Sequence, residues 1–189
     1  MRKEDGFSLL SVIVTLAIVL TLLGSVIPTI ETSLQNYRLS ASAREIAAEI
    51  QSARYRALRA NAMSTFMLLP TGSQFGIDVT GDGSITSGTT DVILNLNRSV
   101  SFANLSTPPN NMSGVTTLST GSKSGIGFTP RGTITLVNSS TGLPDFATAV
   151  GANGFAVYLS NTRSKYMCIT VSPAGRVRTW SSSNGSTWK

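Results

Sequence analysis

The residues with the clearest chemical potential are two arginines near the end of the chain, in the stretch Gly-Arg-Val-Arg at 175–178. In a strand, residues two apart share a face and lie about 6.6 Å apart. Arg176, Arg178 and Trp180 would then line one face, with Val177 on the other. Guanidinium groups bind phosphates through paired hydrogen bonds, and an exposed indole can stack on a base. The spacing is therefore compatible with a DNA-binding surface.

The charge distribution also favours an anionic partner. The chain of 189 residues carries 15 basic and 9 acidic residues, a formal net charge of +6. No acidic residue follows Asp145, and Arg163, Lys165 and Lys189 could widen the basic surface. A basic C-terminal third points to nucleic acid, lipid headgroups or an acidic protein surface. A solvent-facing strand, with Trp180 used for packing, is the alternative interpretation of the same residues.

A second candidate is the polar loop at 78–91. Four of its residues have the spacing of positions 1, 3, 5 and 6 of a calcium-binding loop: Asp78, Thr80, Asp82 and Gly83. Thr89 occupies the position of the bidentate acid, and only Asp91 is near it. The flanking segments are expected to be strands rather than helices. We therefore predict a polar hairpin connection here, with calcium binding as the less favoured alternative.

The sequence offers little for catalysis. It contains no histidine, which removes the commonest general base and the commonest metal ligand. Its one cysteine, Cys168, lies among alternating apolar residues and is expected to be a buried small hydrophobe that forms no intrachain disulfide. No nucleophile–base pair and no phosphate-cradling loop is recognisable. The expectation is a protein without enzymatic activity, cofactor or metal.

The first element that must position these residues is an N-terminal helix. Residues 7–30 carry no charge, and as a helix of about 36 Å they would cross a bilayer core of about 30 Å. Arg2 and Lys3 precede this run and place the N-terminus in the cytoplasm, with everything after residue 30 outside. Small and hydroxylated residues favour close helix packing, although a lone anchor with incidental polar residues is also compatible. Pro28 favours a kink or a break.

Residues 31–62 continue the helix in amphipathic form. Apolar side chains recur there at alternating steps of four and three: Leu39, Ala43, Ile46, Ile50, Ala53 and Ala57. Arg54, Arg56 and Arg59 crowd the last turns and are expected to be a solvated helix end that complements the helix dipole.

After residue 63 the apolar period changes to two, in short runs bounded by Gly, Pro, Ser and Asn. These runs predict strands, whereas segments 104–125 and 138–153 are typical of surface loops. We predict an α+β fold in which the long N-terminal helix, membrane-spanning and then amphipathic, packs against a half-buried antiparallel β-sheet in a β-rich domain over 63–189.

The start of the chain resembles a known processing signal. A short charged leader over residues 1–6, ending in glycine and followed by Phe7 and a long apolar helix, resembles the type III signal of type IV pilins and pseudopilins. The resemblance implies that a prepilin peptidase cuts between Gly6 and Phe7 and methylates the new N-terminus. It also implies that the helix over 7–30 first anchors the subunit and later packs in a filament core, where Pro28 matches the family's weak point.

One position departs from the family pattern. The fifth residue of the mature chain is normally glutamate, whose carboxylate neutralises the N-terminal amine of a neighbouring subunit. Here that residue is Ser11. Because a buried unpaired charge is costly, its loss favours a tip or priming position, or low abundance, over the filament interior.

Three later stretches resemble the GspH/FimT family of minor pseudopilins and minor pilins. They are AAEIQSARYRALRAN at 47–61, GFTPRGTI at 127–134 and ITVSPAGRVRTW at 169–180. In that family, FimT-type minor pilins carry a C-terminal G-R-x-R motif implicated in DNA binding during natural transformation, which Arg176 and Arg178 match.

The resemblance implies one of two functions. The chain would be a structural subunit of a type IV pilus or type II secretion pseudopilus, or a DNA-binding minor pilin for DNA uptake. Other pilins or pseudopilins, the prepilin peptidase and the inner-membrane assembly platform are the expected partners, with DNA added in the second case. The expected location is the bacterial inner membrane, with the C-terminal domain outside and incorporation into a filament.

Overall fold

The computed structural model describes residues 9–69, 73–109, 112, 114–119, 124–138, 140–146, 150 and 152–189. The predicted cleavage junction between Gly6 and Phe7 lies outside these residues. The chain divides into two compact units, Met1–Leu34 and Gln35–Lys189, which we describe separately. The second unit is called the head below.

Helix α1, Leu9–Ala60, begins in the first unit and ends in the head. In the first unit the large apolar side chains that the structure describes between Leu9 and Ile30 are exposed. This stretch makes α1 long and apolar enough to cross a membrane. Pro28 lies inside the helix without ending it, so the break suggested at Pro28 is not present. One proline removes one backbone donor, and the surrounding helical hydrogen bonds hold the segment together.

Several hydroxyl groups of α1 are satisfied within the helix itself. Thr15 donates to the carbonyl of Val12, and Thr32 donates to the carbonyl of Pro28, each at 2.9 Å. A hydroxyl that bonds its own helix leaves no unsatisfied donor facing lipid. These threonines are therefore compatible with a membrane span without any bond to another helix.

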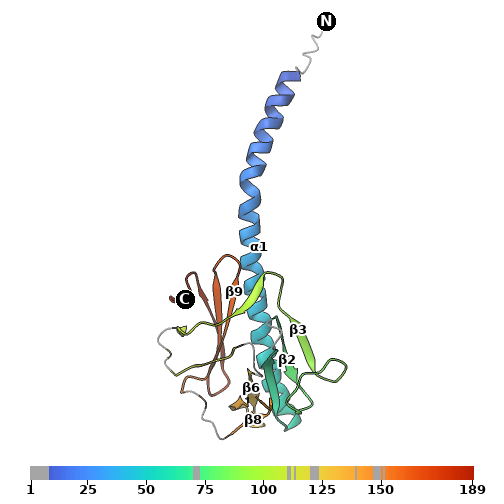
Figure 1. Cartoon of the computed structure of the whole chain (residues 1–189), viewed down its shortest axis with the longest axis vertical. Coiled ribbons are helices and arrows are strands. Elements are labelled where there is room, and N and C mark those ends of the chain that lie inside the picture. Colours follow the sequence, from blue (N-terminus) through green and yellow to red (C-terminus); the bar gives the residue numbers. More distant parts are fainter. Residues whose placement is uncertain are drawn as a thin grey trace. The chain divides into compact units, whose positions relative to one another are not determined.

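In the head, the C-terminal half of α1 lies between two sheets. The strands are β1 Ser64–Leu68, β2 Gln74–Asp78, β3 Val92–Asn95, β4 Val100–Ala103, β5 Thr116–Thr117, β6 Ser124–Phe128, β7 Ile134–Val137, β8 Pro144–Asp145, β9 Phe155–Asn161, β10 Tyr166–Val171 and β11 Val177–Ser182. One sheet has the order β3-β2-β1-β6-β7-β8 and the other β11-β10-β9-β4, with β5 pairing β9 in parallel. Figure 1 shows β9 on one side of the helix and β2 and β3 on the other.

The core forms where the helix meets both sheets. The apolar stripe of α1 predicted above is fully buried, and Ile46 and Ile50 have no exposed surface. They belong to one cluster with Phe66 of β1 and Phe155 of β9. The predicted α+β fold is confirmed. The strands form two sheets, and α1 buries apolar side chains against both of them.

The central strand β9 of the five-stranded sheet is buried on both faces, whereas β11 at the edge is largely exposed. The outer face of β9 carries Tyr158, which forms a second cluster with Cys168 and Trp188. Leu105 and Val115, from the segment predicted as a surface loop over 104–125, pack against this cluster. The indole of Trp188 donates to the carbonyl of Thr107 at 3.1 Å, for example. Burial of Cys168 is confirmed, and it raises the pKa of that thiol well above its usual range.

Candidate functional site

The two candidate arginines lie at the turn between β10 and β11 and at the start of β11. Gly175 N–H donates to the Ser172 carbonyl at 2.7 Å, and Ser172 N–H donates to the Arg176 carbonyl at 2.9 Å. Gly175 has a φ of 75°, a conformation that glycine adopts without strain. Arg176 therefore closes the turn and precedes the strand.

Within β11, Arg178 and Trp180 share the outer face of the sheet. Arg178 is paired with Thr170 and Trp180 with Cys168, while Val177 packs against the main core on the other side. Trp180 is half-buried, and its indole N–H donates to the Thr170 hydroxyl at 3.0 Å. This tryptophan packs against the second cluster. Its geometry fits the packing alternative better than base stacking.

Arg163 and Lys165 lie at the opposite end of β10, in the turn between β9 and β10. There Asn161 donates to Asn36 of α1 at 3.1 Å. The Gly175 turn contacts Arg54, 18 residues further along α1, which corresponds to about 27 Å of helix. Arg163 and Lys165 therefore do not adjoin Arg176. The predicted basic residues form two groups at opposite ends of the head.

Arg54 was expected to be a solvated helix end, but it connects α1 to both sheets. Its Nη1 donates to the carbonyl of Gly175 at 3.2 Å, while its Nε is buried without a hydrogen-bond partner. A Cβ built on Gly175 would lie 2.8 Å from this Nε, and one on Gly132, in the β6–β7 turn, would lie 3.3 Å from it. The two turns have similar sequences, Thr-Pro-Arg-Gly-Thr and Ser-Pro-Ala-Gly-Arg. This similarity is a feature of the sequence that could have indicated equivalent roles for the two turns. Arg54 thus fixes the turn that carries Arg176.

The loop at 78–91 directs its carboxylates to its own backbone. Asp78 is buried, and its oxygens accept hydrogen bonds from Gly81 N–H at 2.6 Å and from Gly83 N–H at 2.9 Å. In the described residues no group of three or more acidic, histidine or cysteine side chains could hold a metal ion. Residues 79–91 form a polar connection between β2 and β3.

Asp91 closes the same loop from its other end. Its carboxylate accepts hydrogen bonds from the backbone N–H groups of Val79 at 2.9 Å and Thr86 at 3.1 Å. Partial burial acts to raise the pKa of Asp91. The hydrogen bonds from the loop backbone together outweigh burial and leave the pKa below its usual value. The charged form of Asp91 is therefore the one that holds the loop.

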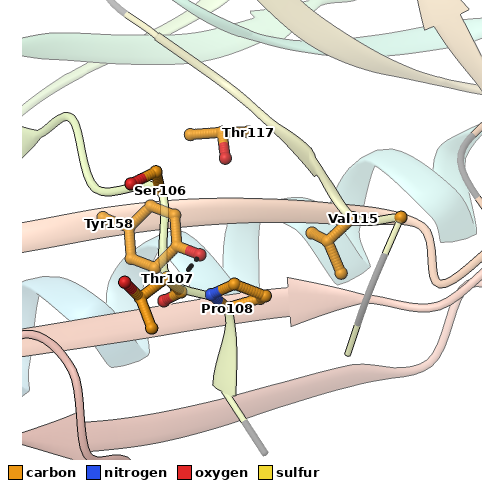
Figure 2. A pocket seen from close by; sticks show the side chains of 7 residues that line it. Ser106, Thr107, Pro108, Val115, Thr117 and Tyr158 are labelled. Carbon is orange, nitrogen blue, oxygen red and sulfur yellow. Dashed lines mark hydrogen bonds between the residues drawn. The ribbon is translucent and has the colours of Figure 1, made fainter. Parts of the chain in front are cut away.

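A hollow of about 590 Å³ lies over the outer face of the five-stranded sheet. It is lined by Ser106, Thr107, Pro108, Gly114, Val115, Thr117 and Tyr158. Figure 2 shows the Tyr158 hydroxyl directed at the carbonyl of Thr107, to which it donates at 3.5 Å. Burial raises the pKa of Tyr158 well above its usual range, so this phenol stays protonated. The described lining contains hydroxyls and apolar groups but no base to activate them.

Comparisons with known proteins give one structural likeness. No protein-family model matches the sequence, and no curated protein matches it. The crystal structure of the type IV minor pilin FimU from Pseudomonas aeruginosa is similar, with a TM-score of 0.45 and 14% sequence identity. The match covers 76% of this chain and 88% of that chain. A likeness at this level carries no argument about function.

Proposed function

We propose that this chain is a minor pilin or pseudopilin, a structural subunit of a type IV pilus or a type II secretion pseudopilus. One observation carries the proposal: a leader sequence that ends in Gly6 precedes a single helix, α1, with two different halves. The first half exposes its apolar side chains, and the second half forms the core of the head. An apolar helix that its own head leaves uncovered suits a subunit that is anchored in the inner membrane before it joins a filament.

Processing after Gly6 is part of the proposal. In cells with active prepilin peptidase, the mature chain should begin at a methylated Phe7, as read by intact mass and N-terminal sequencing. Gly6→Val should leave the leader attached, because the branched side chain replaces the small residue at the cleavage position. A chain that still begins at Met1 beside active peptidase would contradict processing. Absence of crosslinks to any other pilin or pseudopilin would contradict assembly.

Ser11 supports a position at the tip or in priming within this proposal. It replaces the carboxylate that would pair with a neighbouring N-terminal amine, so a subunit above this one in the filament core would leave its charge unpaired. Pro28 would supply the local weak point of the helix on extraction from the membrane. The assembly platform would be the partner at that step.

DNA binding is a second candidate function, favoured by the two exposed arginines of the β10–β11 hairpin. Arg176 and Arg178 are both exposed, and the turn before them is held against α1 by Arg54. A fixed backbone holds the two charges at a set separation, which favours binding to adjacent phosphates. A chain with this property would be a DNA-binding minor pilin for DNA uptake.

The double variant Arg176→Ala/Arg178→Ala tests this candidate. Binding of the full chain to duplex DNA, measured by fluorescence anisotropy at several salt concentrations, should lose up to about two units of log–log salt slope, near one for each phosphate contact. Arg163→Ala/Lys165→Ala removes the same charge from the β9–β10 turn, at the opposite end of β10, and should change the salt slope less. No binding at low salt, or equal slopes for both double variants, would reject DNA binding centred on the Gly175 turn.

A further inference from the structure

A small hollow beside the Gly175 turn brings an aromatic ring next to cationic side chains. It has a volume of about 220 Å³ and is lined by Gln51, Arg54, Tyr55, Gly175, Arg176 and Val177. Pockets for drug-sized ligands measure about 300–1,000 Å³. The smaller volume here suits one planar group or one phosphate rather than an extended small molecule.

Tyr55 is the unusual member of this group. Its side chain is 67% exposed, although it is a large aromatic residue on the helix that forms the core. It belongs to neither hydrophobic cluster of the head. Gln51 lies one helical turn before it on the same face of α1. Tyr55 therefore presents a ring to solvent beside the hollow without any visible role in stabilising the fold.

The cationic side of the hollow is held in place by backbone contacts. Arg54 donates to the Gly175 carbonyl, and the adjacent Arg176 is exposed. A Cβ on Gly175 would lie 3.0 Å from the carbonyl oxygen of Gly132, so the two turns are in close contact. The position of Arg176 relative to Tyr55 is thus set by α1 and by both turns.

From this arrangement we propose that the hollow binds one unpaired base of a single-stranded nucleic acid, stacked on Tyr55, with a neighbouring phosphate on Arg176. Stacking on an exposed ring tolerates any base, and a guanidinium group beside it binds the backbone. Tyr55 would stack on the base, a role that the sequence suggested for Trp180. The indole N–H of Trp180 instead donates to the Thr170 hydroxyl. The inference rests on the second candidate function and specifies which form of nucleic acid that function would use.

The test compares two tyrosines of the same helix. Tyr37 is 70% exposed and also lines a hollow with an arginine, Arg44, so Tyr37→Ala is a matched control for Tyr55→Ala. The full chain in a nonionic detergent is titrated with labelled oligothymidine and with duplex DNA of equal length. Tyr55→Ala should weaken binding of the single strand by about 5- to 150-fold, the range for loss of one stacked base.

Four further results are expected. Tyr55→Ala should leave the salt slope unchanged because it removes no charge, and Tyr55→Phe should retain single-strand binding because it keeps the ring. Arg176→Ala should lower the single-strand slope by about 0.7. Duplex binding should be insensitive to Tyr55→Ala, since paired bases have no free face.

The outcomes separate this inference from the functions on which it depends. Equal effects of Tyr55→Ala and Tyr37→Ala, or an equal loss on duplex, would overturn the stacking site. If the stacking site were overturned but Arg176→Ala/Arg178→Ala still abolished duplex binding, DNA binding would stand as the second candidate function without the stacking site. If neither form of DNA bound at low salt, the stacking site and the second candidate would both fall, and the proposal of a minor pilin would be unaffected.

Discussion

Ile46→Ala should lower the free energy of unfolding of the head by about 2–5 kcal/mol, the usual range when a fully buried isoleucine is truncated. Ile46 has no exposed surface and lies in the cluster that joins α1 to both sheets. Truncation therefore leaves a cavity at the point where the two sheets share one helix. The free energy of unfolding of a domain of this size is only about 5–15 kcal/mol, so the loss is a large fraction of its stability.

The measurement is urea unfolding of the full chain in a nonionic detergent, followed by tryptophan fluorescence. The chain contains two tryptophans, Trp180 and Trp188, and both lie in the head, so the signal reports the head alone. Tyr37→Ala removes a larger side chain from the same helix at an exposed position, and a change below about 1 kcal/mol is expected. Similar losses for the two variants would mean that α1 does not form the shared core.

The second large effect is expected at the polar loop, where Asp78→Ala should lower the free energy of unfolding by about 2–4 kcal/mol. Asp78 is buried and accepts hydrogen bonds from Thr80, Gly81 and Gly83. Removing the carboxylate leaves the buried N–H of Gly83 without an acceptor, which costs more than the loss of an exposed hydrogen bond.

Asp82→Ala is the matched control in the same loop. Asp82 is exposed, and its carboxylate accepts from Ser84 N–H at 2.8 Å, so its removal should cost less than about 1 kcal/mol. Calcium should leave the unfolding midpoint of the wild-type chain unchanged, because the Asp78 oxygens already accept from the loop backbone. A calcium-dependent rise in the midpoint that Asp78→Ala abolishes would instead support the calcium alternative.

Much of the architecture follows from local patterns in the chain. The charge-free run predicts a helix that can span a membrane, because length and hydropathy alone decide that property. The buried stripe from Leu39 to Ala57 follows from the period of 3.6, because one face of a helix must find apolar partners. Short β5 and β8 were missed, since each is two residues long and lies in a segment whose composition is typical of a loop.

The sequence by itself determined a long helix, its two different halves, a β-rich head and a basic C-terminal third. Only the tertiary structure decided that this helix separates two sheets, because period-two patterns do not say which strands pair. It also decided which basic residues are neighbours. Arg163 and Arg176 are 13 residues apart in sequence but lie in turns at opposite ends of β10, whereas Arg54 and Gly175 are in contact although 121 residues separate them. Local spacing reports the face of one element, and only packing between elements brings Tyr55 and Arg176 to the same hollow.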